Sequence, residues 1–417
     1  MESNAKYILL LKITHIAYIL LTCKTINIHA LLIIVTQKIT TKAKLHSHII
    51  WSTPRIIFVL VLIMGSVCIL LFQRQNQRSF IQSRLSPHDN KIILDFSAPN
   101  DHCAPLQKGE QKKLLHVAAG VAGFYNKYNT WFSKKWQCLT GQSVTIEQLS
   151  GASGDFKRSV IKGEMSPDII TMSNPAEMDE IAEQTNSVPT SWRNSFPYDS
   201  SPYYSAVIFM VQKGNPKHIK DWKDLTSPNI TIAVSNPKTC GGGRWVYTGA
   251  LGYGKYISDA THDRTTEYLT QFYANVPKLY NNQGESGDAF TKNNERDVLI
   301  TYEKFVLGTL PNNKNIEMIV PPRTIMIEIP IAIAVHNTDQ RHTTEIANAY
   351  VAGLYDPEVQ RLIAEDYLRP RITTRATDLL SRFPAIKLFK NEDVFDSKKN
   401  TQKMHLQDGG VFDRLLQ

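Results

Sequence analysis

The chain has 417 residues, of which 42% are apolar and 20% are charged, so it is long enough for two domains and too apolar to be disordered. Its net charge of +9 indicates a nucleic-acid-binding protein only if the excess lies on a folded domain. Residues 1–91 hold 11 of the 47 Lys and Arg and 2 of the 38 Asp and Glu, which leaves 36 of each sign in the remainder. The body is therefore electrically balanced, and we predict no nucleic-acid partner.

The N-terminal segment has the pattern of a membrane anchor. Residues 56–72 form an uncharged apolar run of 17 residues, which is the lower end of the length of a spanning helix. No small-residue cleavage site follows Phe72, which favours an uncleaved anchor over a removed export signal. Residues 1–55 then form a basic and apolar leader, and residues 73–90 a polar stalk.

Strand and helix patterns alternate along the rest of the chain. Strands are predicted at 91–96, 143–148, 168–172, 206–211, 230–234, 297–301, 316–320 and 329–335. Helices are predicted at 112–136, 175–182, 245–256, 266–274, 343–354 and 357–366, and a further helix begins with Ser153 as its N-cap. The alternation predicts an α/β fold with mostly parallel sheets, in which ligands bind where the carboxyl ends of the strands meet.

Three predicted strand-to-helix loops combine glycine with a hydroxyl or thiol, at 151–154, 240–243 and 284–287. The second has three glycines in a row after Cys240. Glycine lets the backbone approach a ligand closely, and the open N–H groups of a helix's first turn favour an anion. Any one of these loops is also the pattern of an ordinary turn, but together they predict one anion site. We expect Glu285 in the third loop to point to solvent, because its carboxylate would repel an anion.

Seven motifs occur in order along the chain: VQKGNPK (211–217), IKDWKDL (219–225), NPKTCGGGRW (236–245), DVLI (297–300), YLRPR (367–371), FPAIKLF (383–389) and DGGVFD (408–413). Together they resemble the periplasmic sulfate- and thiosulfate-binding proteins of bacterial ABC uptake systems, over the region from 140 to the C-terminus. The resemblance implies a type II periplasmic binding protein fold, in which two lobes joined by a hinge enclose an oxyanion. It also implies delivery of the anion to an ABC permease, with no catalysis, no cofactor and no metal.

The resemblance assigns roles to individual residues. The expected ligand-binding residues are Ser153, Gly241, Gly242 and Ser286 through backbone N–H groups, and Cys240 and Tyr302 through their side chains. Such a site offers few acceptors, so it rejects a protonated oxyanion such as phosphate. We expect Arg244 to orient the glycine loop (236–243) through a salt bridge, and contact with the ligand is the alternative.

Three positions depart from the family's pattern. Cys240 stands where the family has Ser, and Tyr302 where it has Trp. The family's Asp-Pro-Thr-Arg loop is replaced at 96–101, where Ser97, Asn100 and Asp101 are the candidates for the missing donor. These departures predict altered specificity or weakened binding.

The resemblance also implies a domain plan. Lobe 1 takes 91–204 and 325–370, lobe 2 takes 205–324, and 371–417 packs across both lobes. We expect a monomer in the periplasm, held to the inner membrane by 56–72. Cys103 and Cys138 are candidates for a disulfide in such an oxidising compartment, which leaves Cys240 single.

Two alternatives remain open at this stage. The first is a degenerate anchored binding or scaffold protein with an altered ligand, which would explain the three departures. The second is an enzyme with Cys240 as nucleophile, in which the same N–H groups would stabilise an anionic intermediate. The enzyme needs a base near the thiol, and no His lies within 20 residues of Cys240 in the sequence.

Overall fold

The structure is a computed structural model that describes residues 103–104, 111–119, 122–258, 262–293, 295–395 and 401–417. All of these belong to one compact unit, Ser79–Gln417. The predicted leader, anchor, stalk and first strand (1–55, 56–72, 73–90 and 91–96) lie outside the described residues, as do the candidate donors Ser97, Asn100 and Asp101. None of the helices in the described part has the length and apolarity that a membrane crossing requires.

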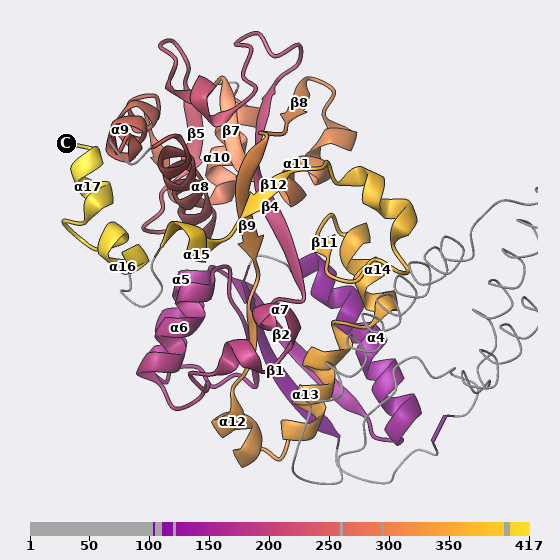
Figure 1. The fold of residues 1–417 in the computed structure, drawn as a ribbon. Coiled ribbons are helices and arrows are strands. Elements are labelled where there is room, and N and C mark those ends of the chain that lie inside the picture. Colours follow the sequence, from indigo (N-terminus) through magenta and orange to yellow (C-terminus); the bar gives the residue numbers. More distant parts are fainter. Residues whose placement is uncertain (1–102, 105–110, 120–121, 259–261, 294, 396–400) are drawn as a thin grey trace, which may run out of the picture. The chain divides into compact units, whose positions relative to one another are not determined.

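The described strands form two sheets, seen in the lower and upper halves of Figure 1. The small sheet has the order β10 (Ile331–Ile333), β3 (Ile169–Thr171), β1 (Lys112–Ala119) and β2 (Val144–Gly151). The large sheet has the order β12 (Lys387–Phe389), β9 (Arg323–Glu328), β4 (Tyr203–Gln212), β7 (Val298–Tyr302), β5 (Ile232–Ser235) and β6 (Leu279–Tyr280), and β8 (Ile316–Ile319) and β11 (Arg369–Pro370) also pair with β4.

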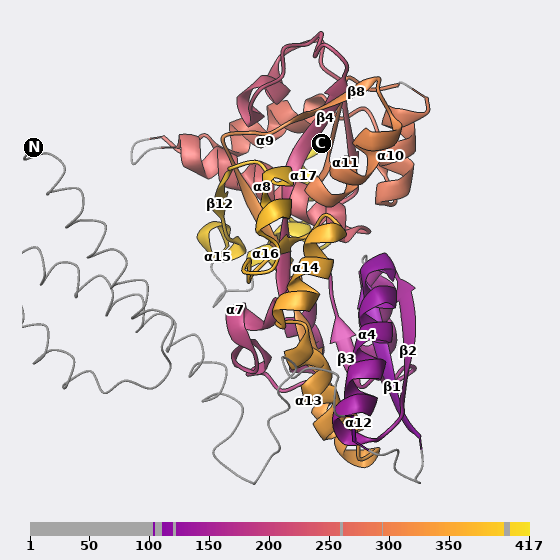
Figure 2. The same ribbon diagram turned by 90° about the vertical axis from the view of Figure 1, so that its right-hand side faces the viewer.

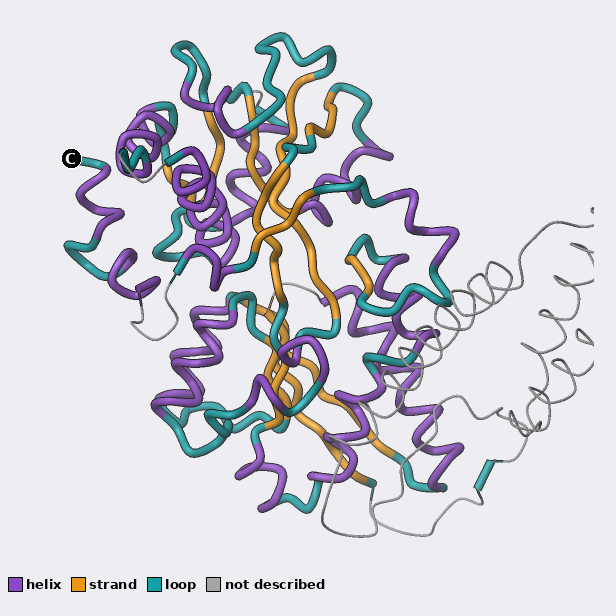
Figure 3. The backbone as a smooth tube through the Cα atoms, viewed as in Figure 1, coloured by secondary structure: helices purple, strands orange, loops and turns teal. Residues whose placement is uncertain are grey.

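Helices alternate with these strands (Figure 3). The α-helices are α4 (Ala122–Thr140), α5 (Ser153–Ile161), α6 (Pro175–Gln184), α7 (Pro197–Ser200), α8 (Gly241–Ile257), α9 (Thr265–Ala274), α10 (Gln283–Thr291), α11 (Glu303–Thr309), α12 (Val335–Gln340), α13 (Thr344–Gly353), α14 (Pro357–Glu365), α15 (Asn391–Val394), α16 (Thr401–Leu406) and α17 (Val411–Leu415). Short 3-10 helices are η1 (Trp192–Asn194), η2 (Trp222–Thr226), η3 (Leu310–Asn312) and η4 (Thr377–Arg382). In both Figure 1 and Figure 2, α4 and α13 lie beside the small sheet. The α/β class predicted from the alternation is confirmed.

The prediction of mostly parallel sheets is wrong. Of the ten strand pairings in the described part, five are parallel and five antiparallel. Four of the antiparallel pairings belong to β4, which runs against β7, β8, β9 and β11. The sequence 316–333 supplies β8, β9 and β10 in succession with no helix between them, so the rule that a helix separates parallel neighbours does not apply there.

The predicted helix at 112–136 is also partly wrong, because its first eight residues form β1. This strand lies between β2 and β3, so its apolar side chains are buried on both faces and lose the alternation that marks an edge strand. The helix itself begins at Ala122. In the same way the strand predicted at 329–335 is limited to β10, and β9 before it was not predicted.

A disulfide joins Cys103 and Cys138, the two candidates whose pairing the sequence left open. Cys240 is the free cysteine among the described residues and is partly exposed. Disulfides persist in oxidising compartments, so this bond agrees with a protein body outside the cytoplasm.

Candidate functional site

The first turns of α5 and α8 meet at Ser173, which follows β3. The Ser173 N–H donates to Ser153 Oγ at 3.2 Å, and Ser153 is the first residue of α5. At the first residue of α8, a Cβ added to Gly241 would lie 2.1 Å from Ser173 Oγ. A larger residue at 241 would therefore displace the Ser173 side chain or the first turn of α8.

Three further side chains surround Gly242, the second residue of α8. A Cβ added there would lie 3.5 Å from Cys240 Sγ, 3.6 Å from Tyr302 OH and 3.7 Å from Gln283 Oε1. Tyr302 ends β7, and Gln283 begins α10. The structure therefore brings five of the six predicted residues, Ser153, Cys240, Gly241, Gly242 and Tyr302, to one place, and it adds Gln283 to them.

The first amides of α5 and α8 have no acceptor within their own helices. The N-cap residues Ala152 and Cys240 make no side-chain capping hydrogen bond. The first helical bond of α8 is Arg244 N–H to Cys240 O at 3.1 Å, so the amides of Gly241, Gly242 and Gly243 precede it. The predicted N-cap role of Ser153 is wrong, because Ala152 holds that position and the Ser153 hydroxyl donates elsewhere.

The start of α10 is arranged differently. Its N-cap Asn282 accepts from the Glu285 N–H at 2.9 Å through the side chain and from the Ser286 N–H at 3.3 Å through the backbone carbonyl. The Ser286 hydroxyl pairs with Ser235 Oγ at 3.1 Å. The Ser286 amide, predicted as a ligand donor, is thus used inside the helix, and the amides of Gln283 and Gly284 are the ones that precede it without a capping bond. Glu285 is exposed, as predicted.

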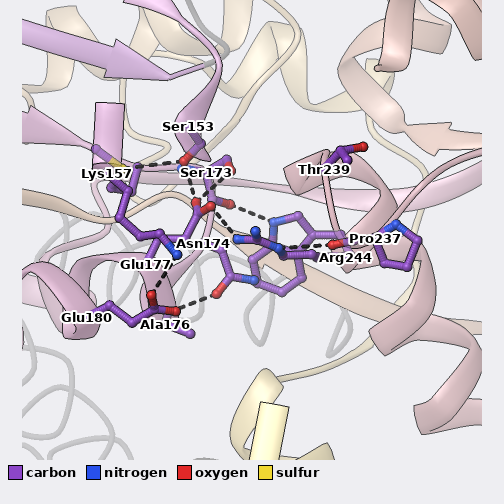
Figure 4. A network of polar contacts seen from close by, with 12 residues as sticks. Ser153, Lys157, Ser173, Asn174, Ala176, Glu177, Glu180, Pro237, Thr239 and Arg244 are labelled. Carbon is purple, nitrogen blue, oxygen red and sulfur yellow. Dashed lines mark hydrogen bonds and ion pairs between the residues drawn. The ribbon is translucent and has the colours of Figure 1, made fainter. Parts of the chain in front are cut away.

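A buried carboxylate that the sequence did not reveal lies behind these helix starts (Figure 4). Glu177, in the first turn of α6, is 1% exposed. It accepts hydrogen bonds from Ser153 Oγ and from Ser173 Oγ, the latter at 3.1 Å, and it forms an ion pair with Arg244 of α8. A buried charge is tolerated only when it is paired and hydrogen-bonded, and these three donors meet that requirement.

Arg244, seen in Figure 4, and Trp245 connect α8 to the segment after β3. Arg244 Nε also donates to Pro237 O at 3.1 Å, inside the glycine loop. The predicted salt bridge that orients this loop is confirmed, with Glu177 as its partner. The indole Nε1 of Trp245 donates to Ser173 O at 2.6 Å. Residues that follow the small sheet and residues that follow the large sheet therefore build the site together.

The phenol of Tyr302 remains a donor at neutral pH. Burial raises its pKa well above the usual value, and the neighbouring Cys240 thiol and Glu177 carboxyl raise the pKa further. The groups that converge are therefore backbone amides, a phenol and a thiol, together with a carboxylate that Arg244 already neutralises. Such a set suits an anion and supplies no free cation.

Residues 114–369 match the model of a family described as bacterial extracellular solute-binding protein. The sulfate-binding protein of Escherichia coli is 34% identical over 307 residues, which are 73% of this chain and 92% of that protein. The thiosulfate-binding protein of Pseudomonas aeruginosa is 33% identical over 305 residues, which are 72% and 91% of the two chains. The chain belongs to the bacterial extracellular solute-binding protein family.

A solved structure agrees with this membership. The sulfate-binding protein SubI from Mycobacterium tuberculosis H37Rv is similar with a TM-score of 0.59 and 25% identity, over 68% of this chain and 96% of that chain. The two-lobed α/β fold of periplasmic binding proteins is thereby confirmed for this solute-binding protein, as is the resemblance seen in its motifs. The family consists of transport components and not of enzymes, and its place is the periplasm. The hypothesis of a Cys240 nucleophile is therefore not favoured.

Of the residues that the sequence did not reveal, only one left a local signal. Asn282 followed by Glu285 is the spacing of a capping pair, and it would have placed the start of α10 at Gln283. Glu177 left no such signal, because its ion-pair partner Arg244 is 67 residues away in the sequence. Ser173 left none either, because Trp245, which donates to its carbonyl, is 72 residues away. In the described part of this solute-binding protein, no group of three or more His, Cys, Asp or Glu could hold a metal ion.

Proposed function

We propose that this protein binds sulfate, thiosulfate or a related tetrahedral oxyanion at the converging starts of α5, α8 and α10, and delivers it to an ABC permease. The observation that carries the proposal is the contact of Gly241 with Ser173 and of Gly242 with Tyr302, which fixes the open amides of α8 beside those of α5. Helix N-termini bind dianions through such amides without a charged side chain. The relatives named for sulfate and thiosulfate support this choice of ligand.

Within this proposal, the amides of Ser153, Gly241 and Gly242 donate to the anion, and the Cys240 thiol and the Tyr302 phenol add side-chain donors. The backbone donor from the third loop is the amide of Gln283 instead of that of Ser286. Ser286 then serves the site indirectly, since its hydroxyl joins α10 to Ser235 at the end of β5.

The arrangement of Glu177 supports discrimination against phosphate. A protonated oxyanion needs an acceptor for its O–H, and a buried O–H without one costs about 1–3 kcal/mol. The oxygens of Glu177 already accept from Ser153, Ser173 and Arg244. The Glu177 carboxylate of the site is thus already hydrogen-bonded and does not serve as acceptor for a phosphate O–H. Sulfate and thiosulfate carry no proton at neutral pH, so they need no such acceptor.

Thermal unfolding of the full-length protein with each anion tests the proposal. We expect sulfate or thiosulfate to raise the melting temperature in a concentration-dependent way, because a ligand that binds only the folded state stabilises it. Molybdate tests the related oxyanions, and phosphate at the same concentration is the matched control. A melting temperature that none of the four anions changes would contradict the proposed function.

The domain plan and the anchor belong to the same proposal. We place lobe 1 at 91–204 and 325–370, lobe 2 at 205–324, and 371–417 across both, in a monomer. The step from β9 in the large sheet to β10 in the small sheet supports a crossing between Glu328 and Ile331, a few residues after the proposed boundary at 325. Anchoring by 56–72 is supported by its apolar run alone. Release of the protein into the soluble fraction of lysed cells would contradict the anchor and leave the binding function untouched.

A further inference from the structure

The last residues of the chain pack on the helix that begins the site. We call residues 401–417, with α16 and α17, the C-terminal strap; it lies beside α8 and α9 in Figure 1. His405 Nδ1 and Tyr247 OH share a hydrogen bond of 2.7 Å. The ring of Phe412, which is 1% exposed, makes edge contacts with Tyr247 at 5.6 Å and Tyr273 at 5.2 Å. The strap is therefore fixed to α8 and α9 by buried aromatic contacts.

From this position the strap holds one side chain of the glycine loop. Lys238 Nζ lies 2.7 Å from Asp408 Oδ1 and 2.9 Å from Asp413 Oδ2. The same oxygen of Asp413 accepts from the Gly409 N–H at 2.7 Å. Hydrogen bonds from Lys238 and Gly409 lower the pKa of Asp413, so this carboxylate stays charged at neutral pH.

The loop that carries Lys238 has little freedom left. The Lys238 N–H donates to Asn236 Oδ1 at 2.9 Å, and Thr239 Oγ1 donates to Asn281 O at 3.0 Å, just ahead of α10. Only Thr239 and Cys240 separate Lys238 from Gly241. A displacement of Lys238 is therefore passed to the first amides of α8.

The exposed fractions of the three side chains indicate the role of this ion pair. The Asp408 side chain is 100% exposed, and those of Lys238 and Asp413 are each 26% exposed. Exposed ion pairs add little to the stability of a fold, because water screens them. A contact of this kind three residues ahead of Gly241 is better explained by the geometry that it gives to the loop.

We propose that Lys238, held by Asp413 and Asp408 of the C-terminal strap, is a positioning residue for the oxyanion site. It sets the glycine loop so that the amides of Gly241 and Gly242 face the anion. The inference rests on the proposed function for the identity of the ligand, and on the strap contacts alone for the position of the loop.

The first measurement is the sulfate or thiosulfate dissociation constant of full-length variants. Lys238→Met is expected to weaken binding about tenfold, as for one lost hydrogen bond, while the ligand-free melting temperature stays within the range of the control. The control is Lys113→Met, which removes a more exposed ion pair of 2.5 Å between Lys113 and Glu147 on the small sheet. Lys238→Asp combined with Asp413→Lys is expected to recover part of the affinity that Lys238→Asp loses. A Lys238→Met protein that binds as tightly as the unmodified one, or that loses stability in proportion to affinity, overturns the inference.

A second measurement needs no ligand and separates this inference from the proposed function. Cys240 lies two residues after Lys238 and is partly exposed. We expect maleimide to label the Cys240 peptide several-fold faster in Lys238→Met than in Lys113→Met, read by mass spectrometry. If the unmodified protein binds no oxyanion but this rate changes, the proposed function fails and the positioning role stands. An unchanged rate overturns the positioning role, whatever the ligand.

Discussion

The starts of α8 and α10 look alike in sequence and differ in structure. Each follows a strand of the large sheet and contains glycine, a hydroxyl or thiol, and a helix-forming segment. Cys240 leaves the first turn of α8 without a side-chain cap, whereas Asn282 binds the Glu285 amide of α10. A cap residue thus decides whether the amides of a helix start are used by the protein or remain for a ligand.

The starts of α8 and α10 also differ in the segments that they contact. The start of α8 is joined to the segment after β3 by Arg244 and Trp245, which contact Glu177 and Ser173. The side chains of Ser286 and Gln283 in α10 form hydrogen bonds with the large sheet itself, at Ser235 and Thr301. The open helix start is therefore the one that both sheets hold, and the following variants test that difference in order of expected effect.

Arg244→Met tests the link from α8 to Glu177. It leaves a carboxylate that is 1% exposed without its ion-pair partner, which typically costs about 3–5 kcal/mol of unfolding free energy. Arg158→Met, which removes the exposed pair with Asp155, is the control and is expected to cost less than about 1 kcal/mol. Urea unfolding measures the loss of unfolding free energy in both variants. Equal losses would show that the Arg244 pair stabilises the fold no more than the exposed pair does.

Gly241→Ala tests the close approach at the open helix start. The new Cβ would lie 2.1 Å from Ser173 Oγ, so either the Ser173 hydroxyl must turn away from its partner Glu177 or the first turn of α8 must move away from Ser173. We expect the anion to bind about 100-fold more weakly, as for the loss of two hydrogen bonds. Gly284→Ala in α10 places its Cβ 3.2 Å from Asn282 Oδ1 and is expected to change affinity far less. Titration calorimetry on both variants decides, and a Gly284→Ala loss as large as that of Gly241→Ala would remove the distinction between the two loops.

His116 supports the segment opposite α8 from inside the core. It is fully buried, its Nε2 lies 2.9 Å from Thr171 Oγ1 near Ser173, and burial lowers its pKa from 6.5 to about 3. The unfolded chain takes up a proton below pH 6.5 and the folded chain does not until about pH 3, so stability is full above pH 6.5 and falls as the pH drops. The loss at pH 5 is about 2 kcal/mol relative to pH 8. Urea unfolding at pH 5 and pH 8 should show that His116→Gln lacks this part of the loss of unfolding free energy. An equal loss in the variant and the unmodified protein would contradict the assignment to His116.

Asn282→Ala and Cys240→Ala test the cap itself. Removing the Asn282 side chain frees the Glu285 amide and is expected to cost about 1 kcal/mol of unfolding free energy. Cys240 makes no side-chain capping bond, so its replacement should cost less. Thermal unfolding without ligand measures both, and a larger loss for Cys240→Ala would show that the two helix starts are capped alike.

How much could be predicted from the sequence depended on how far apart along the chain the interacting residues lie. The three glycines after Cys240 indicated a strand-to-helix junction because turn chemistry acts over a few residues, but the helix predicted from 245 begins at Gly241. The Glu177 carboxylate escaped prediction because its partners Ser153 and Arg244 lie 24 and 67 residues away. Strand β1 was taken for helix because a strand buried on both faces has no alternation. The order of the sheets depended in the same way on the antiparallel course of β4, which no local pattern encodes.

The pairing of Arg244 with Glu177 has a consequence for the speed of capture. Because the guanidinium is committed to a carboxylate, the two charges cancel at a distance, and an approaching dianion meets only the dipoles of amides. Dipole fields fade faster with distance than those of a bare cation, so little long-range steering is available. The association rate should then change little between low and physiological ionic strength. The anion reaches the site by unassisted diffusion, and the amides attract it only at short range.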